Sequence, residues 1–343
     1  MPTLNKFLEN KTILVCGGCG FMGSNFIRFI LDNFKKTKII NLDLLTYAGN
    51  KDNLKEINLK NYSFIRGDIN NTKLVAGLMK KADLAVNFAA ETHVDKSIHG
   101  GAPDFVRTNI LGVQSLLEAL RQSPKILKFI QISTDEVWGD LSLNSKIKFT
   151  EKSAFKPNSP YAASKAAGDL LVRSYFRTYG LPMIVSHSVN NFGPRQFPEK
   201  LIPFFALRAM QNKPLPLYGD GKNVRDWLYV DDHSSAILTL FQKAKTGEVY
   251  AISRSEEYSN LEIADRILKI LDKSNNLITF VKDRPGHDRR YSVDSSKLRL
   301  LGWQPKFSFE KQLKKTISWY KENLQWFNNV LKKSSEINKH IKI

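Results

Sequence analysis

Tyr161 and Lys165 are four positions apart at the start of a stretch with helical periodicity. On a helix, side chains at positions i and i+4 lie on one face, one turn apart. A phenol has a pKa of about 10, so it serves as a base at neutral pH only when a nearby cation stabilises its phenolate. The plainer alternative is an exposed Tyr/Lys pair, but Ser133 and Thr134 end the preceding predicted strand and offer a hydroxyl to the same substrate oxygen. Together these residues predict a site that removes the proton of a secondary alcohol during its oxidation.

Two adjacent carboxylates, Asp135 and Glu136, follow Thr134 directly. Oxidation of an alcohol does not require them. In a closed site, neighbouring carboxylates push their pKa values apart, so that one stays protonated and acts as an acid. The alternative is a pair of solvated residues at a strand end. Beside the predicted Tyr/Lys site, we favour a reaction that includes an elimination.

A glycine-rich turn joins a predicted buried strand, Lys11–Cys16, to a predicted helix, Ser24–Phe34. Gly17, Gly20 and Gly23 give a G-x-x-G-x-x-G spacing. The first glycine permits the tight turn, the second lets a pyrophosphate approach the backbone, and the third allows close packing of helix and strand. The N-terminus of the helix adds free N–H groups and a positive dipole end. This context predicts a dinucleotide site.

Two aspartates and two cysteines refine the prediction for this site. Asp43 follows Gly23 by 20 residues and ends the next predicted strand, where a carboxylate binds ribose hydroxyls and repels a 2′-phosphate, so NAD is favoured over NADP. Asp68 is placed to meet the adenine edge, although an ordinary strand-end turn explains it equally well. Cys16 and Cys19 form a C-x-x-C without a second pair, which excludes a four-cysteine zinc site. We interpret both as incidental small residues and expect no metal.

Short β-branched strands alternate with helical patterns in the first half of the chain. The expected strands after the first are Lys38–Leu42, Tyr62–Ile65, Leu84–Phe88, Lys128–Ile132 and Met183–His187. The expected later helices lie near Asn53 and over Asp104–Arg121 and Tyr161–Tyr179. This alternation predicts a Rossmann-like α/β fold with a doubly wound parallel sheet. His187, on an apolar strand, is expected to be a core histidine rather than a ligand.

The sequence pattern changes after Asn190, where several prolines interrupt the alternation of predicted strands and helices. We therefore expect an NAD-binding domain over residues 1–188, with a returning segment near 229–252. Residues 189–228 and 253–325 are expected to form a smaller C-terminal substrate-binding lobe, followed by a basic tail over 326–343.

Composition limits the class of protein. The chain has 343 residues, 42% of them hydrophobic, so it can bury a core, and no stretch approaches the roughly 20 apolar residues of a bilayer helix. Its net charge of +19 raises the possibility of nucleic-acid binding, but the basic residues are scattered rather than interleaved with aromatics, and we expect no nucleic-acid partner. Two cysteines fit a reducing compartment, and we expect a cytoplasmic protein with no membrane association.

Several segments together resemble the nucleoside-diphosphate-sugar 4,6-dehydratases of the extended short-chain dehydrogenase/reductase superfamily. They are GGCGFMGSNFI, NLDLLTYAGN, AAETHVDKSI, STDEVWGDL, YAASKAAGD, NNFGPRQFPEKLIP, PLYGDGKNVRDWLYVDDH and DRPGHDRRY. The resemblance runs in order to about residue 320, and STDEV separates it from 4-epimerases, which usually lack the Asp-Glu pair.

This resemblance implies a mechanism that agrees with the residues. Tyr161, helped by Thr134 and Lys165, removes the proton of the sugar C4 hydroxyl while hydride passes from C4 to NAD. Glu136 then removes the C5 proton, Asp135 protonates the departing C6 hydroxyl, and the hydride returns to C6. The cofactor ends as it began and must stay bound through the cycle.

The resemblance also implies binding residues and partners. Further cofactor contacts are expected at Phe21, Met22, Thr46, Ile69, Ala89, Thr108 and Asn191. Substrate contacts are expected at Thr92, Asn190, Lys200, Leu201, Arg225, Asn260, Arg284 and His287. Tyr218 suits a position beside the nucleobase, although an aromatic between Pro216 and Gly219 is explained equally well as a core residue. His93 is expected near the site without a role in proton transfer. The resemblance favours dTDP-glucose as substrate, with UDP-glucose as the alternative. A 4-epimerase or decarboxylase activity is a more distant alternative. The resemblance also implies a homodimer.

Overall fold

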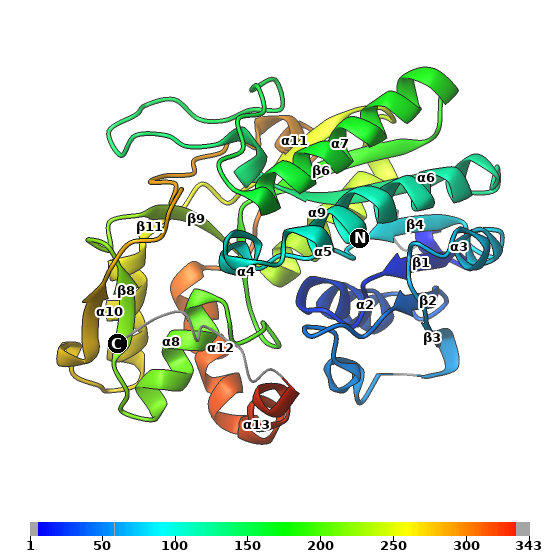
Figure 1. Ribbon diagram of the computed structural model, residues 1–343. Coiled ribbons are helices and arrows are strands. Elements are labelled where there is room, and N and C mark those ends of the chain that lie inside the picture. Colours follow the sequence, from blue (N-terminus) through cyan, green and yellow to red (C-terminus); the bar gives the residue numbers. More distant parts are fainter. Residues whose placement is uncertain (1–5, 58, 334–343) are drawn as a thin grey trace.

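A seven-stranded parallel sheet forms the larger part of the molecule (Figure 1). The structure, a computed structural model, describes residues 6–57 and 59–333. The strands are β1 (Thr12–Cys16), β2 (Lys38–Asp43), β3 (Tyr62–Arg66), β4 (Leu84–Asn87), β5 (Lys128–Thr134), β6 (Met183–Ser188) and β10 (Val249–Ile252). Their order is β10-β6-β5-β4-β1-β2-β3, and the direction of the crossovers reverses between β1 and β4. Ligands bind at such a switch point, outside the carboxyl ends of the strands.

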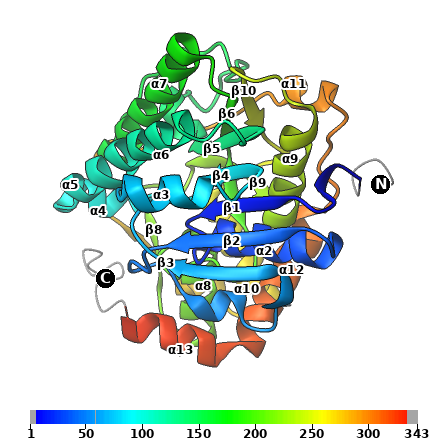
Figure 2. The same cartoon turned by 90° about the vertical axis from the view of Figure 1, so that its right-hand side faces the viewer.

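Helices cover both faces of this sheet (Figure 2). One face carries α3 (Thr72–Met79), α6 (Gly112–Arg121) and α7 (Pro160–Tyr179), and the other carries α2 (Phe21–Asn33) and α9 (Val230–Lys243). Alternate residues of β1 enter the two cores: Leu14 packs with α3, α6 and α7, whereas Ile13 and Val15 pack with α2 and α9. The continuous apolar run of β1 follows from this burial on both sides. The expected doubly wound fold is confirmed.

A smaller lobe lies beside the carboxyl ends of the strands. Its strands are β7 (Asn190–Phe192), β8 (Leu215–Tyr218), β9 (Val224–Tyr229), β11 (Glu257–Ser259) and β12 (Ile278–Val281), arranged as β11-β9-β7 and β12-β8. Its helices are α8 (Leu201–Met210), α10 (Asn260–Ile270), α12 (Phe309–Glu322) and α13 (Leu324–Lys333). These elements share a separate core that includes Phe192, Leu217, Ile263 and Tyr320.

The packing departs from the expected division of the chain in two places. Residues 293–303 were expected in the smaller lobe, but Val293, Leu298 and Trp303 pack in the core of the large sheet, next to α11 (Ser296–Leu300). Residues 326–333 were expected in a basic tail, but α13 buries Trp326 and Phe327 in the core of the lobe. Apolar side chains at helical spacing, rather than the lysines between them, decide the position of α13. The rest of the expected tail, 334–343, lies outside the described residues.

Two expected helices differ in detail. The segment near Asn53 is a single 3₁₀ turn, Lys51–Leu54. The helix expected over Asp104–Arg121 consists of α5 (Ala102–Val106), a π-helical turn (Arg107–Leu111) and α6. The wider turn buries Asn109, whose side chain bonds the backbone of Glu91 and the hydroxyl of Ser164. Such π-turns re-aim a side chain within a helix.

The remaining short elements lie mostly near the strand ends. They are α4 (Val94–His99) and the 3₁₀ turns Leu59–Asn61, Asp135–Trp138 and Asn275–Leu277. Within residues 6–57 and 59–333, no helix has the length and apolar character needed to cross a membrane.

Candidate active site

The glycine-rich turn leaves no room for a side chain at Gly17 or Gly23. Gly17 has a φ of +76°, and a Cβ there would lie 2.5 Å from the backbone nitrogen of Ala89. A Cβ on Gly23 would lie 2.4 Å from the carbonyl oxygen of Gly17. Helix α2 then begins at Phe21, with Gly20 as its N-cap and no side chain capping its N-terminus. Close backbone approach and free N–H groups at a helix start are the features that cradle a pyrophosphate.

A cavity extends from this turn along the ends of β1 to β4. Its lining includes eight of the expected cofactor residues: Gly17, Gly20, Asp43, Thr46, Asp68, Ile69, Ala89 and Thr108. The Asp43 carboxylate accepts hydrogen bonds from the backbone nitrogens of Cys19 (2.8 Å) and Leu45 (2.7 Å), which fix it at the end of β2. Burial raises the pKa of this carboxyl despite these two bonds.

Asp68 lies across the same cavity. Burial alone would raise the pKa of this carboxyl, but hydrogen bonds from Asn70 and the ion pair with Arg107 lower it. The cavity therefore combines two carboxylates, a glycine cradle and a helix N-terminus. These residues fit an NAD-type dinucleotide, and Asp43 and Asp68 would hold its adenosine half.

A second cavity continues from the first toward the carboxyl end of β5. It is lined by Phe21, Met22, Gly23, Thr92, Thr134, Asp135, Glu136, Tyr161, Asn190, Asn191 and Lys200, among others. The catalytic residues expected from the sequence therefore share one cavity with the glycine turn, with one exception. Lys165 does not line it, because its Nζ donates to the carbonyl oxygen of Ile132 at 2.7 Å.

The 3₁₀ turn Asp135–Trp138 places Asp135 in a buried position and Glu136 at the cavity surface. Thr134 caps the turn: its hydroxyl accepts from the backbone nitrogen of Glu136 and donates to Asp135, both at 3.3 Å. Asp135 is buried, and burial together with the neighbouring Glu136 raises the pKa of its carboxyl well above the usual range. This shift favours the protonated form of Asp135.

Glu136 reaches into the cavity and is only partly buried. Burial raises the pKa of this carboxyl as well, but three cations act in the opposite direction: Arg284, Arg225 and Lys200. Their field limits the rise at Glu136, so the pKa of Asp135 is raised further than that of Glu136, the order that an acid and a base in one site require.

Helix α7 delivers Tyr161 to the same point. Ser159 caps this helix through the backbone nitrogen of Ala162, and Pro160 occupies its first turn, which fixes where the helix begins. Burial and the carboxylates of Glu136 and Asp135 raise the pKa of the Tyr161 phenol well above its usual value, whereas hydrogen bonding to Thr134 lowers it. The expected stabilisation of the phenolate by Lys165 is not seen in this arrangement and stays a prediction.

The two hydroxyls at the end of β5 have different partners. Thr134 bonds within the catalytic group, whereas Ser133 donates to the Asp169 carboxylate at 2.6 Å. The same Asp169 oxygen lies 2.9 Å from Nε2 of His187, which is fully buried. His187 is therefore a core histidine with a polar partner, as expected.

A third cavity, between the two lobes, gathers the expected substrate residues. It is lined by Asn190, Lys200, Leu201, Tyr218, Arg225, Asn260, Arg284 and His287. Glu136 and Asn190 line both this cavity and the catalytic one, so a single ligand can span them. Arg225 donates to the carbonyl oxygens of Val224 and Asp288 and lies over the Tyr291 ring.

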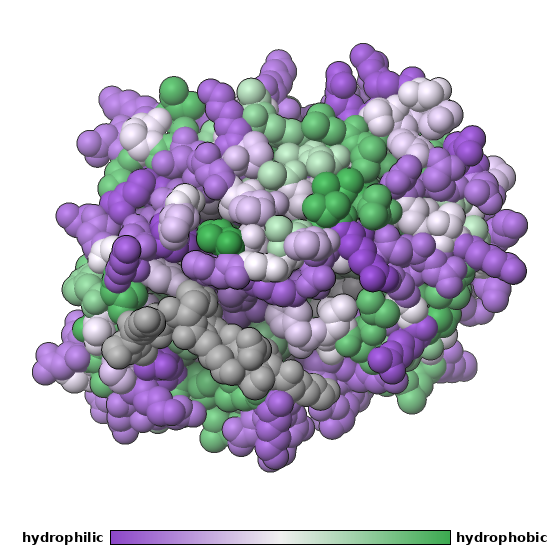
Figure 3. Space-filling view, in the orientation of Figure 1, coloured by the Kyte–Doolittle hydropathy of each residue, from purple (hydrophilic) through white to green (hydrophobic). Residues whose placement is uncertain are grey.

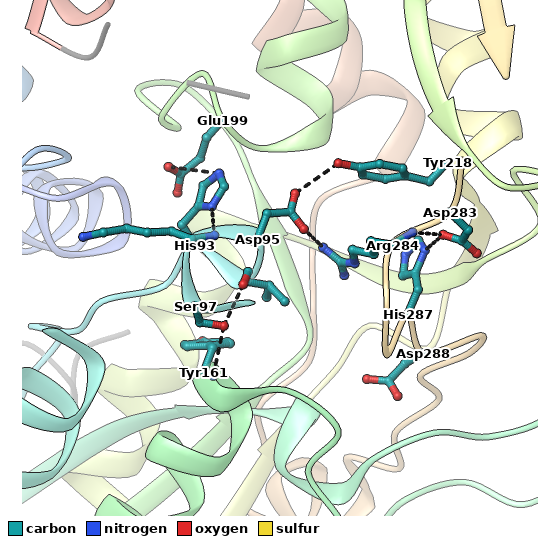
Figure 4. A network of polar contacts seen from close by, with 12 residues as sticks. His93, Asp95, Ser97, Tyr161, Glu199, Tyr218, Asp283, Arg284, His287 and Asp288 are labelled. Carbon is teal, nitrogen blue, oxygen red and sulfur yellow. Dashed lines mark hydrogen bonds and ion pairs between the residues drawn. The ribbon is translucent and has the colours of Figure 1, made fainter. Parts of the chain in front are cut away.

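Several lining residues were missed or left without a role in the sequence analysis. Asp95, Glu199 and Tyr291 line the cavity between the lobes, and so does His93, whose Nε2 lies 3.7 Å from the Glu199 carboxylate (Figure 4). Each lies within a segment that carried the resemblance. The signal was therefore present, but these residue types have no spacing that indicates a role.

The sheet order, the glycine cradle and the Thr134, Tyr161 and Lys165 set define an extended short-chain dehydrogenase/reductase. Within that class, the family described as GDP-mannose 4,6 dehydratase matches residues 14–316. The chain belongs to this family of nucleotide-sugar dehydratases.

Individual relatives agree with this assignment. The chain is 49% identical over 309 residues to the low-salt glycan biosynthesis protein Agl12 of Haloferax volcanii, covering 90% of this chain and 98% of that one. It is 45% identical over 345 residues to dTDP-glucose 4,6-dehydratase of Escherichia coli, covering 93% and 95% of the two chains. The solved structure of DesIV, a dTDP-glucose 4,6-dehydratase from Streptomyces venezuelae with NAD bound, has a TM-score of 0.89 at 42% identity and covers 93% of this chain and 99% of that chain.

Proposed function

We propose that this protein is an NAD-dependent hydro-lyase that converts dTDP-glucose to its 4-keto-6-deoxy form. The observation that carries the proposal is the placement of Asp135 and Glu136 in one cavity with Tyr161, in surroundings that separate an acid from a base. Alcohol oxidation alone needs only the tyrosine, whereas elimination of water needs both carboxyl groups. Relatives named dTDP-glucose 4,6-dehydratase support the reaction and the substrate.

The first step takes place at C4 of the sugar. Tyr161 accepts the proton of the C4 hydroxyl, and Thr134 holds the phenol by a hydrogen bond. NAD, held by the glycine turn, Asp43 and Asp68, would supply the acceptor for the C4 hydride and the source of the hydride that returns to C6. Lys165 lies one turn along α7; to contact the nicotinamide ribose and support the phenolate, its ammonium group would have to leave the carbonyl oxygen of Ile132.

The second step is the elimination. The C4 ketone acidifies the neighbouring C5 hydrogen, and Glu136 takes that proton. Burial raises the pKa of Glu136, which makes it a stronger base than ordinary glutamate, while Arg284 and Arg225 limit that rise and favour the carboxylate form. Protonated Asp135 gives its proton to the C6 hydroxyl, which leaves as water, so the proton count balances within the pair.

The cavity between the lobes suits the nucleotide half of the substrate. Arg225 and Arg284 are placed to bind the diphosphate, since guanidinium groups hold phosphate oxygens through paired hydrogen bonds. Tyr218 would pack against the nucleobase. Thymine and uracil differ by one methyl group, which a pocket distinguishes by only about 1–3 kcal/mol. The preference for dTDP over UDP therefore rests on the relatives.

We also propose that the enzyme is a cytoplasmic homodimer. Figure 3 shows apolar side chains gathered over α6 and α7, and Leu111, Leu170 and Tyr179 of this region are about half exposed. Two copies that bring these helices together would cover them. Cys16 and Cys19 are both free thiols, which suits a reducing compartment.

Mass spectrometry of reactions with dTDP-glucose and UDP-glucose, run in parallel, tests the proposal. A product lighter by one water, without release of reduced cofactor, is expected, with the higher rate on dTDP-glucose. Formation of a galactose epimer at constant mass would replace the proposal with a 4-epimerase. A faster reaction with UDP-glucose would overturn the nucleotide assignment alone.

A further inference from the structure

Asp95 connects the two lobes through its side chain (Figure 4). It lies in the first turn of α4, which follows β4 of the large sheet, and its side chain is buried. One carboxylate oxygen lies 3.1 Å from a terminal nitrogen of Arg284, and the other accepts a hydrogen bond from the Tyr218 hydroxyl at 3.3 Å. Both partners belong to the smaller lobe. A single carboxylate therefore holds the side chains expected to bind the diphosphate and the nucleobase.

The two arginines of the cavity are held in different ways. Arg225 is fixed by backbone carbonyl oxygens on its own side of the cavity, at 2.8 and 2.9 Å. Arg284 is held across the cavity by Asp95, and its buried Nε has no hydrogen-bond partner among the described residues. The second carboxylate that acts strongly on Arg284 is Glu136, the proposed base. The orientation of Arg284 therefore depends on Asp95 in a way that the orientation of Arg225 does not.

The same short helix contacts the catalytic tyrosine. Ser97, two residues after Asp95, accepts a hydrogen bond from the backbone nitrogen of Tyr161 at 3.3 Å. The Nδ1 of His93 caps the start of α4 by accepting from the backbone nitrogen of Lys96 at 2.9 Å. A displacement of α4 would therefore disturb both the nucleotide half of the cavity and the start of α7.

We propose that Asp95 is a positioning residue for the substrate diphosphate and that it acts through Arg284. Both Asp95 and Glu136 attract the guanidinium group, and the hydrogen bond to Asp95 sets its position at the diphosphate site. This inference rests on the proposed function, because it takes the diphosphate of a nucleotide sugar as the ligand.

Loss of the Asp95 carboxylate has two opposite effects on diphosphate binding, one through its charge and one through the position of Arg284. Asp95→Asn removes a negative charge from an anion site, which by charge alone would tighten binding of a diphosphate. Loss of the hydrogen bond to Asp95 would also let the Arg284 guanidinium group move toward Glu136, which would weaken diphosphate binding. We expect the second effect to prevail, because a charged hydrogen bond between buried groups depends on fixed geometry.

Calorimetric titration with dTDP tests this on the wild type and on Asp95→Asn, Arg284→Gln and the double variant. We expect Asp95→Asn to weaken binding roughly 10-fold or more, and to have no further effect once Arg284 is replaced. Asp104→Asn is the matched control, because it breaks an ion pair with Lys96 outside the cavity, and its dTDP affinity should equal that of the wild type. Asp95→Glu keeps the charge and should recover most of the affinity, and it provides the comparison if Asp95→Asn does not fold.

Three outcomes would overturn the inference. Unchanged or tighter binding by Asp95→Asn would show that the carboxylate only competes for Arg284. Equal weakening in both backgrounds, or no recovery in Asp95→Glu, would show a general structural role. Failure of the wild type to bind dTDP would overturn this inference and the proposed substrate together. If the wild type turns over dTDP-glucose but the Asp95 variants bind dTDP as tightly as it does, only this inference fails and the proposed function stands.

Discussion

Asp135 and Glu136 are adjacent in the chain, and burial raises the pKa of both carboxyls, but Glu136 has more cations around it than Asp135. Oδ2 of Asp135 is buried with no hydrogen-bond partner among the described residues, whereas Glu136 faces the positive charges of Arg284, Arg225 and Lys200. The cations therefore limit the rise in the pKa of Glu136, whereas the rise at Asp135 is large. An active site that must donate one proton and accept another needs both states at the same pH.

Replacement of Tyr161 by phenylalanine should abolish turnover. The change removes one hydroxyl from a buried ring and leaves the fold intact, but it removes the group that starts C4 oxidation. A positioned proton acceptor contributes about 10²–10⁴-fold, so the rate of product formation should fall by at least that range. Tyr175→Phe is the matched control, because Tyr175 lies on the same helix and bonds Glu118 away from the cavity. Wild-type turnover by Tyr161→Phe would remove this residue from the mechanism.

The double change Asp135→Asn and Glu136→Gln should separate oxidation from elimination. Both side chains keep their shape but lose the ability to exchange a proton, so C4 oxidation can proceed while water loss cannot. Reduced cofactor should accumulate on the enzyme and be visible by its near-ultraviolet absorbance. Dehydrated product released at the wild-type rate would show that the two carboxyl groups have other roles.

Asp43→Asn should lower the affinity for NAD and weaken the discrimination of the enzyme against NADP. The carboxylate ends β2 at the rim of the dinucleotide cavity, where its charge would bind ribose hydroxyls and repel a 2′-phosphate. We expect NAD affinity to fall roughly 10-fold and NADP binding to become measurable. Titration of cofactor-free protein with each dinucleotide measures both, with Asp52→Asn, at a carboxylate paired with Lys55, as control. Unaltered affinities for NAD and NADP would place the adenosine ribose elsewhere.

His233 should make the protein less stable in mild acid. It is fully buried against Phe88, its ring nitrogens have no hydrogen-bond partner among the described residues, and burial lowers its pKa to about 3. Below its ordinary pKa of 6.5, the unfolded chain binds a proton that the folded chain does not. The contribution of His233 to the free energy of unfolding is therefore fully present above pH 6.5. It declines by up to about 1.4 kcal/mol per pH unit as the pH falls toward 3.

Urea unfolding of the wild type and His233→Phe between pH 7 and about 5 measures this effect. The variant should lose less free energy of unfolding over that interval than the wild type. Asp226, whose pKa burial raises to about 6, acts in the opposite direction, but it is common to both proteins and cancels in the comparison. His99→Asn, at an exposed position, should lose as much as the wild type. A parallel decline in wild type and His233→Phe would contradict the assignment.

The parts of the site that could be predicted from the sequence are local. The turn at Gly17 and the spacing of Tyr161 and Lys165 each lie within one or two consecutive elements, where helix and strand geometry fixes which side chains meet. The same holds for Asp43, which ends a strand that parallel pairing places beside β1. The fold class followed from this alternation of elements.

The remaining features depend on contacts between distant segments. Asp95 and Arg284 are 189 positions apart, and no periodicity relates them. The buried pairing of Ser133 with Asp169 is also invisible in the sequence, because a serine before a threonine at a strand end offers either hydroxyl to the site. Trp326 and Phe327 lie among lysines and asparagines, so their charged neighbours suggested a tail, although the two aromatic rings pack into a core. Tertiary packing decides each of these cases.

Transfer of deuterium within the substrate tests the central claim most directly. With dTDP-glucose that carries deuterium at C4, the account predicts a product that has lost one water and carries the deuterium at C6, because the hydrogen removed from C4 returns to the same molecule. Mass spectrometry and proton resonance spectra locate the label. Deuterium that stays at C4, or appears in solvent while water is lost, would contradict the mechanism proposed for Tyr161, Asp135 and Glu136.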